Sequence, residues 1–252
     1  MVKENAPELL RLELSSRKWK PQELAMSGVT DCYQPVERKL QITRRCLAVL
    51  AEFRNPVSLI TKNYLITRDL DLLRELAAHR AVHVNISINS LNADLARKLE
   101  PRASSPKHRL GAIETLAKAG IPVGVLVAPV IPALNDPEIP AVLAAAKAAG
   151  AGWAATEILR LPLTVAPVFE QWLERTFPEK RDKVLARIRA IRGGKLNDPR
   201  FGTRMRGEGV FADQIAQMFQ VALRKVGLNE DGPELSTADF RRRDGPQLAL
   251  GL

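Results

Sequence analysis

The chain has 252 residues, 46% of them hydrophobic, with a formal net charge of +10 and an isoelectric point near 9.9. These values fit one large α/β domain or two small ones, and the positive charge is compatible with anionic partners, nucleic acid included. No apolar run approaches the roughly 20 residues that cross a bilayer, charges interrupt the first 14 residues where a signal peptide would be apolar, and two cysteines are too few for a disulfide framework. We therefore expect a cytoplasmic protein without a membrane segment.

Helix and strand patterns alternate along the first 165 residues. Amphipathic periodicity predicts the helices, and short apolar runs between them predict the strands. The expected helices span 5–17, 36–53, 70–77, 91–99, 105–120 and 137–150, and the expected strands span 23–29, 57–61, 83–89, 122–128 and 154–159. We expect Thr67 to cap the third helix, and Ser105 and Asp136, each followed by proline, to cap the fifth and sixth.

The segment 83–89 alternates strictly between apolar and polar residues, which is typical of a strand. A strand between helices normally pairs in parallel and is buried on both faces, yet one face here carries His83, Asn85, Ser87 and Asn89. Because an unpaired polar group in a dry interior costs about 1–3 kcal/mol, we expect this row to line a wet or ligand-filled cavity. The alternative is an antiparallel strand whose polar face lies in solvent.

The pattern changes at Ala166, after which no further strand is expected. Helices are predicted from 166, from 178 and over 210–226, with a loop rich in Gly and Arg over 192–209. The tail from Asn229 lacks periodicity, and we expect it to be disordered. The predicted division is a β/α body (1–165), a C-terminal helical extension (166–228) and a tail (229–252).

Strands that are each followed by a helix predict a parallel sheet, either an open doubly wound sheet or a partial barrel. Polar residues recur where the strands end, at Thr30 and Asp31, Thr61 and Lys62, Ser87 and Asn89, and Glu157 and Arg160. A barrel gathers the carboxyl ends of its strands around one site, whereas an open sheet uses only the ends beside a switch point. The recurrence favours an α/β fold of the partial (β/α) barrel type.

Short motifs follow one another over nearly the whole chain. They are Thr30-Asp31-Cys32-Tyr33-Gln34-Pro35, Thr61-Lys62, Ser87-Ile88, Leu99-Glu100-Pro101-Arg102, Ala128-Pro129-Val130-Ile131-Pro132 with Asn135-Asp136, and Arg192-Gly193-Gly194-Lys195-Leu196. In this order and spacing the sequence resembles the radical SAM superfamily, within it the spore photoproduct lyase-like or DNA repair photolyase-like branch. The resemblance implies a partial barrel with C-terminal helices, S-adenosylmethionine (SAM) and a [4Fe-4S] cluster as cofactors, and lyase-like radical chemistry with nucleic acid as a candidate substrate.

The superfamily holds its cluster with three cysteines in a C-x-x-x-C-x-x-C loop after the first barrel strand, and this sequence has no such motif. Cys32 and Cys46 are far apart, and neither position corresponds to a cluster ligand. Residue 2 aligns beyond that strand and loop. We therefore expect a barrel without its first strand, an unpaired edge on strand 23–29 and no cluster on this chain. A gene fragment, a start codon assigned too far downstream and a degenerate relative remain open as explanations.

The resemblance assigns a cofactor-binding set at the strand ends: Thr30, Asp31, Lys62, Ser87, Asn89, Ala128 and Pro129. Asp31 would accept from the methionyl ammonium, and Lys62 would pair with the methionyl carboxylate or a substrate phosphate. Ser87 and Asn89 would meet the ribose or the carboxylate, and Ala128 and Pro129 would pack against adenine. The alternatives are an Asx turn at Asp31, a solvated Lys62 and ordinary barrel packing at 128–129.

Four basic residues are candidates for substrate binding: Arg102, Arg160, Lys195 and Arg204. The last two belong to the Gly- and Arg-rich loop, which could contact phosphates but offers only Phe201 for base stacking. Cys46 is expected in the core, and Cys32 is expected to be a free loop thiol.

Two functions are therefore open, and the sequence assigns no catalytic residue in either. One is a radical SAM enzyme in its full-length form, with this chain inactive alone. The other is a non-catalytic remnant, or a barrel protein that binds adenosine or an anion. A metal-free barrel enzyme that uses Asp31 and Lys62 is a third alternative. The oligomeric state is not predicted.

Overall fold

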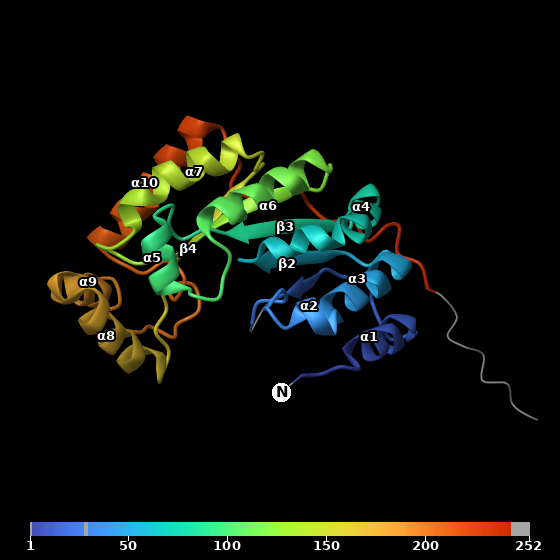
Figure 1. Ribbon diagram of the computed structural model, residues 1–252, viewed down its shortest axis with the longest axis horizontal. Coiled ribbons are helices and arrows are strands. Elements are labelled where there is room, and N and C mark those ends of the chain that lie inside the picture. The colour runs from blue at the N-terminus through green and yellow to red at the C-terminus, as the bar shows by residue number, and fades with distance from the viewer. Residues whose placement is uncertain (1, 28–29, 243–252) are drawn as a thin grey trace, which may run out of the picture.

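The computed structural model describes residues 2–27 and 30–242 (Figure 1). Five parallel strands form one sheet in the order β1-β2-β3-β4-β5. They are β1 (Leu24–Met26), β2 (Val57–Thr61), β3 (Val82–Ser87), β4 (Val123–Val130) and β5 (Ala154–Ile158). Because neighbours in the sheet are also neighbours in the chain, the sheet is singly wound, as in a barrel, and has no switch point. This topology confirms the predicted partial barrel.

β1 lies at one edge of the sheet and pairs with β2, with Leu24 opposite Val57 and Met26 opposite Leu59. Within residues 2–27 and 30–242, no strand pairs with its other side, which agrees with the expected unpaired edge. The strand is shorter than the predicted 23–29, and residues 28 and 29 lie outside the described part of the chain.

Helices that follow the strands pack on one face of the sheet (Figure 1). In chain order, the helices of the described residues are α1 (Ala6–Ser15), α2 (Glu37–Leu40), α3 (Ile42–Phe53), η1 (Tyr64–Asp69), α4 (Leu70–Ala78), α5 (Ala93–Leu99), α6 (Pro106–Lys118), η2 (Asp136–Glu138), α7 (Ile139–Ala148), α8 (Val165–Thr176), α9 (Pro178–Ala190) and α10 (Val210–Val226), of which α1 precedes the first strand and α8 and α9 belong to a second core. None of these helices is long and apolar enough to span a membrane in the described parts of the chain.

The alternation along β3 separates the two faces of the sheet. Val84 and Ile86 are fully buried in the main core, where Leu73 of α4 and Ile113 of α6 also lie. Side chains of the opposite parity, such as Ser87, face the concave side that the crossover helices leave uncovered. Of the four polar residues, only Ser87 lines the cavity at the strand ends. The prediction is wrong for Asn85, which accepts from Nε1 of Trp153 at 2.8 Å, and for His83, whose ring lies 3.3 Å from the carbonyl of Pro233, because other segments cover this end of the row.

The C-terminal helices belong to two different cores. α10 contributes Ile215 and Phe219 to the main core and packs against α7. By contrast, α8 and α9 share a second core with the residues after β4, in which Leu173 and Ile188 meet Ile131. The predicted boundary between 165 and 166 stays a prediction, and residues 166–228 contribute to both cores.

Two predicted helix caps are wrong, and one is confirmed. The hydroxyl of Thr67 donates to the carbonyl of Tyr64 inside η1. It is therefore not the cap of α4, which begins at Leu70 without a side-chain cap. Asp136 lies in the 3-10 turn η2 and makes no capping hydrogen bond, and α7 begins at Ile139. Ser105 accepts from the N–H of His108 and caps α6 as expected.

The predicted helix over 36–53 is divided into α2 and α3. Gln41 lies between them with a φ of 51°, in the left-handed region. That conformation ends α2 and redirects the chain, because a left-handed residue cannot continue a right-handed helix. Periodicity gave no indication of this break.

The expected disorder from Asn229 does not hold over residues 229–242. Asn229 bridges to Trp153 beside β5, and the N–H of Ser236 donates to the carbonyl of Arg80. The ring of Phe240 packs against that of Phe53 in a tilted arrangement, with a centroid distance of 6.4 Å. The segment lacks periodicity because it is an extended strap across the amino ends of the strands, held by backbone contacts. Residues 243–252 lie outside the described part.

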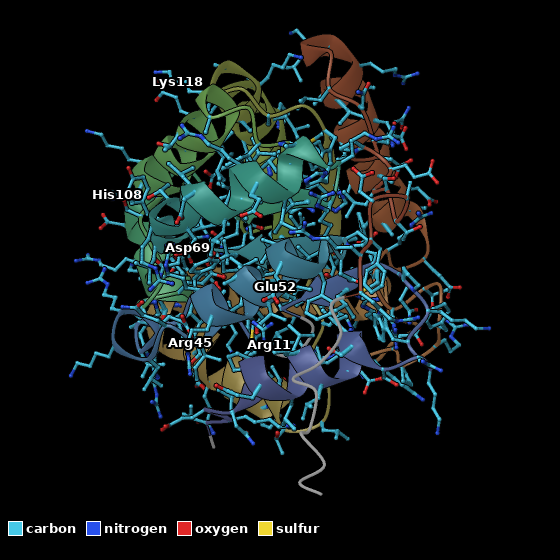
Figure 2. The ribbon with its side chains drawn as sticks, turned by 90° about the vertical axis from the view of Figure 1, so that its right-hand side faces the viewer. Arg11, Arg45, Glu52, Asp69, His108 and Lys118 are labelled. Atoms are coloured by element: carbon cyan, nitrogen blue, oxygen red, sulfur yellow. The ribbon has the colours of Figure 1, made fainter. Side chains whose placement is uncertain are left out.

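At the N-terminus, α1 packs against α3 and buries Leu14 completely. Arg11 of α1 forms an ion pair with Glu52 of α3 at 2.5 Å, and Figure 2 shows the two side chains side by side. Arg45 of α3 donates to the carbonyl of Glu4 just before α1. Polar contacts thus flank the apolar interface and hold α1 on the outside of the barrel.

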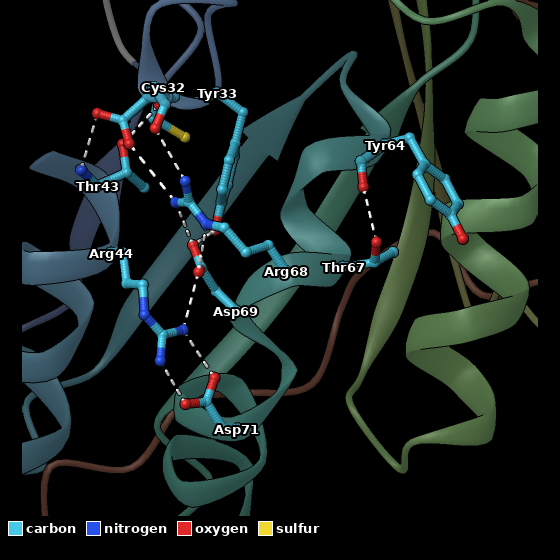
Figure 3. A network of polar contacts seen from close by, with 10 residues as sticks. Cys32, Tyr33, Thr43, Arg44, Tyr64, Thr67, Arg68, Asp69 and Asp71 are labelled. Atoms are coloured by element: carbon cyan, nitrogen blue, oxygen red, sulfur yellow. Dashed lines mark hydrogen bonds and ion pairs between the residues drawn. The ribbon is translucent and has the colours of Figure 1, made fainter. Parts of the chain in front are cut away.

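A buried charge network holds the loop after β1 against α3 and η1 (Figure 3). Asp69 is 0% exposed, and it accepts from the Tyr33 hydroxyl at 3.1 Å, from Arg44 at 3.0 Å and from Arg68 at 2.8 Å. Burial and the charge of Asp69 raise the pKa of Tyr33 well above its usual value, so the phenol stays a donor. A single carboxylate therefore joins three segments.

We expect Asp69→Ala to lower the free energy of unfolding by about 3–5 kcal/mol, because it leaves the buried phenol of Tyr33 without its acceptor and removes a buried ion-pair partner from Arg44 and Arg68. Asp71→Ala is the matched control. Asp71 also pairs with Arg44, but its side chain is 59% exposed, so the expected loss is below about 1 kcal/mol. Urea unfolding followed by circular dichroism measures both, and equal losses would contradict the assignment.

Candidate functional site

A cavity of about 770 Å³ opens at the carboxyl ends of the strands. Seven of the residues that the sequence predicted for cofactor or substrate binding line it: Thr30, Asp31, Lys62, Ser87, Ala128, Pro129 and Arg160. They come from the ends of β1 to β5, which a singly wound parallel sheet brings to one edge. The strand-end cavity is thus the place where most of the predicted residues converge.

Four predicted residues do not line this cavity. Arg102 and Lys195 are exposed, and Arg204 lies over the ring of Phe201 at 4.7 Å. Asn89 is only 2% exposed and enclosed, and neither atom of its amide group has a hydrogen-bond partner among the described residues. The sequence shows that Arg102, Lys195 and Arg204 lie in loops, but the direction of a loop is decided by tertiary packing.

Asp31 organises the floor of the cavity. Its Oδ1 accepts from the N–H of Tyr33 at 2.8 Å and from the hydroxyl of Thr61 at 2.7 Å, and its Oδ2 accepts from the N–H of Lys62 at 2.8 Å. The bond to Tyr33 is the Asx turn that the sequence offered as an alternative. The carboxylate therefore joins the loop after β1 to the end of β2, and it keeps one acceptor position for a ligand.

Lys62 is one end of a chain of charges. Its Nζ lies 2.8 Å from Oε1 of Glu100, and Oε2 of Glu100 lies 2.7 Å from Nη2 of Arg109. Arg109 is 1% exposed and also donates to the carbonyls of Ser87 at 3.0 Å and Ser104 at 2.7 Å. We name Lys62, Glu100 and Arg109 the triad; its net charge is +1, so the wall beside Ser87 is electropositive.

Sequence reasoning did not single out Arg109, although a signal was present. Arg109 occupies the same helical stripe of α6 as Ile113 and Leu116, which are both fully buried. A cation in an apolar stripe is unusual, because a buried charge needs a partner. Its partner, Glu100, belongs to the Leu99-Glu100-Pro101-Arg102 motif, of which only Arg102 was considered.

Asn135 joins the ends of β3 and β4. Its Nδ2 donates to the carbonyls of Asn89 at 2.7 Å and Pro129 at 3.0 Å, and its Oδ1 accepts from the N–H of Ile131 at 2.6 Å. The side chain is buried, so these bonds are shielded from water. This amide therefore ties the backbone at Pro129, which lines the cavity, to the segment that follows β3.

The β5 side of the cavity is lined by Glu157 and Arg160. Behind it Arg192 is 3% exposed and donates to the carbonyls of Leu159 at 2.9 Å and Thr203 at 3.0 Å. Burial and the nearby charge of Arg160 lower the pKa of Arg192, while Asp198 and Glu157 act in the opposite direction. This wall therefore carries one guanidinium group and one carboxylate, with the buried guanidinium of Arg192 as a second positive charge nearby.

The two cysteines lie apart from one another, Cys32 in the loop after β1 and Cys46 in α3. Burial raises the pKa of the Cys32 thiol to about 12 and that of Cys46 to about 11. Within the described ranges, no group of three His, Cys, Asp or Glu side chains is arranged to hold a metal ion. A thiolate ligand is disfavoured at both positions, because burial favours the neutral thiol.

A model of the radical SAM superfamily matches residues 4–146. The chain belongs to this superfamily. Uncharacterized proteins of Mycobacterium tuberculosis and Mycobacterium bovis are 33% identical over 181 residues, which is 71% of this chain and 53% of theirs. An uncharacterized protein of Methanocaldococcus jannaschii is 33% identical over 55% of this chain and 50% of its own. The chain spans about half the length of these curated relatives.

Among solved structures, the fold is similar to that of a spore photoproduct lyase in which one cysteine is replaced by serine, with a TM-score of 0.58. The match covers 88% of this chain and 62% of the lyase at 18% sequence identity. At this identity the similarity shows the radical SAM fold. The strand-end cavity thus occupies the place where barrels of parallel strands gather their functional groups.

We expect Arg109→Leu to lower the free energy of unfolding by about 3 kcal/mol or more, because it removes a buried charge and leaves carbonyls of Ser87 and Ser104 without their donor. The control is Lys62→Met at the other end of the triad. The Lys62 side chain is 34% exposed, so its loss should cost less than about 1 kcal/mol. Urea denaturation measures the free energy of unfolding of both variants. A smaller loss for Arg109→Leu than for Lys62→Met would contradict the role of the triad.

We also expect slow alkylation of Cys32. With its pKa raised to about 12, the thiol is almost wholly protonated at pH 8, and only the thiolate reacts. Iodoacetamide should modify it at least about 100-fold more slowly in the native protein than in urea, as measured by mass spectrometry, with the native rate still rising above pH 9. A native rate equal to that in urea would show an exposed thiol with an ordinary pKa.

Proposed function

We propose that this chain binds SAM in the strand-end cavity and supplies the cofactor-binding part of a radical SAM enzyme. The observation that carries this proposal is the convergence of Asp31, Lys62, Ser87 and Pro129 on one cavity. Its volume of about 770 Å³ lies in the range of pockets that hold cofactors. The superfamily membership of the chain supports SAM as the occupant.

The lining residues offer a partner for each part of SAM. Lys62 would bind the methionyl carboxylate, since the triad leaves one positive charge uncompensated. Asp31 would accept from the methionyl ammonium through its remaining acceptor position, and Ser87 would bind a ribose hydroxyl. Ala128 and Pro129 would form an apolar wall for adenine.

The unpartnered amide of Asn89 supports a ligand in this region. Its carbonyl is held by Asn135, which also holds Pro129 on the cavity wall. A buried amide without partners is rare in native proteins and costs about 1–3 kcal/mol. We place Asn89 against the ribose or the carboxylate, where a small adjustment of the wall on binding would supply its hydrogen bonds.

The iron-sulfur cluster of the superfamily does not fit the residues of this chain. Three thiolates are needed, and the chain contains Cys32 and Cys46, both with raised thiol pKa values and in different elements. We therefore assign the cluster to residues outside this sequence. The role we assign to this chain is to bind and orient SAM and to exclude water around it.

For the substrate we propose an anionic molecule, with nucleic acid as the candidate, bound on the β5 side of the cavity. Arg160 lines that side, and Arg192 adds a second positive charge behind it. The net charge of +10 favours association with a polyanion. Arg102, Lys195 and Arg204 lie outside the cavity and are proposed as contacts to more distant parts of such a substrate.

SAM binding can be tested by isothermal titration without any cluster. We expect saturable binding to the folded chain, weakened about 10- to 100-fold by Lys62→Met, because a charge-assisted contact contributes about 1.5–3 kcal/mol. Lys118→Met removes the same charge from a side chain that is 74% exposed on α6, and it should leave the affinity unchanged.

Absence of saturable binding by the folded protein would reject the proposal and favour a non-catalytic remnant. Equal affinity for wild type and Lys62→Met would place SAM elsewhere. Circular dichroism of each variant confirms that the fold is retained, which the partial exposure of Lys62 leads us to expect.

A further inference from the structure

A second cavity, unrelated to the strand ends, lies between η2, α9 and α10 (labelled in Figure 1 except for η2). Its volume is about 370 Å³, and it shares no lining residue with the strand-end cavity. Most of its wall is apolar, with Phe211, Ile215 and Met218 of α10 as the largest apolar side chains. A mainly apolar cavity with a few polar groups is the usual form of a small-molecule site.

Asp136 lines this helix-side cavity and has an unsatisfied oxygen. Its Oδ1 is buried and has no hydrogen-bond partner among the described residues. Burial raises the pKa of Asp136, whereas backbone hydrogen bonds and, to a smaller extent, the charges of Arg187 and Lys183 lower it. Because χ2 of aspartate is a broad torsion, the carboxylate can turn this oxygen towards a ligand.

Lys183 and Arg187 line the same cavity from α9. Among the described residues, neither side chain forms a hydrogen bond or an ion pair within 4 Å. The guanidinium of Arg187 lies 3.4 Å from the centre of the Phe211 ring, a cation–π contact that holds it at the wall. With Asp136 ionised, the three side chains carry a net charge of +1.

We propose that the helix-side cavity binds a small organic monoanion with an apolar body and a hydrogen-bond donor, of the class of aromatic 2-hydroxy acids. Its carboxylate would lie between Lys183 and Arg187, and its hydroxyl would donate to Asp136. Its apolar body would pack on Met218 and Ile215. Such a ligand neutralises the net charge, satisfies the orphaned oxygen and fills the apolar volume at the same time.

Met218 provides a local probe. In protein labelled with ¹³C at the methionine methyl groups, we expect 3-phenyllactate to shift the Met218 resonance saturably and to leave that of Met26 in β1 unchanged. The matched ligand 3-phenylpropionate has the same charge and ring but lacks the hydroxyl. Its affinity should be about 5- to 10-fold lower, the usual contribution of one such hydrogen bond.

A pair of matched lysine variants tests the role of Lys183 in binding. Lys183→Gln should weaken phenyllactate binding about 10-fold or more, whereas Lys180→Gln, one turn earlier on the same helix and outside the lining, should not change it. Both side chains are exposed, so both variants should fold.

Three results would overturn the proposal. The first is a Met218 resonance that neither acid shifts, which would leave water as the partner of Asp136. The second is equal affinity for the two acids, and the third is equal binding by Lys183→Gln and wild type. Each leaves SAM binding at the strand ends untouched, so the two proposals fail separately.

Discussion

The geometry of the strand ends depends on one buried guanidinium. Arg109 is 1% exposed, which would be prohibitive for an unpaired charge, and it is tolerated because Glu100 and two backbone carbonyls surround it. One of these carbonyls belongs to Ser87, the last residue of β3, so the charge that α6 brings into the core also fixes a cavity residue. Packing and site formation are coupled through this residue.

Polar side chains also hold the ends of the neighbouring strands. Asp31 connects the loop after β1 to the end of β2, and Asn135 connects the ends of β3 and β4. In each case a short polar side chain satisfies backbone groups that the parallel sheet leaves unpaired where its ladder ends. The loops over the cavity are therefore held without a helix or strand of their own, and a preorganised wall lowers the cost of binding a ligand.

The two cavities differ in origin. The strand-end cavity follows from the fold, since any singly wound parallel sheet brings its carboxyl ends together. The helix-side cavity exists because α9 belongs to the second core and α10 to the main core, and Asp136 lies where they meet. At this junction Oδ1 of Asp136 is buried without a hydrogen-bond partner among the described residues.

Sequence alone determined the class of fold and seven of the residues that line the strand-end cavity. Period-two and helical patterns predicted β2, β3, β4 and β5 and the helices between them. The reason is that burial of one face of a helix or strand requires apolar residues at regular intervals in the sequence. The strand-end residues Asp31, Lys62 and Ser87 were identified because parallel topology implies that strand ends converge.

Only the tertiary structure decided which charges meet. The pairing of Glu100 with Arg109, the enclosure of Asn89 and the ordered path of residues 229–242 along the amino ends of the strands join segments distant in sequence. The periodicity of apolar residues does not predict such contacts, because they depend on the direction of loops and on the desolvation of individual charged groups. The local pattern of apolar and polar residues thus specified the helices and strands of this protein. Ion pairs and hydrogen bonds to backbone groups, formed between distant segments, specified how the ends of these elements are joined.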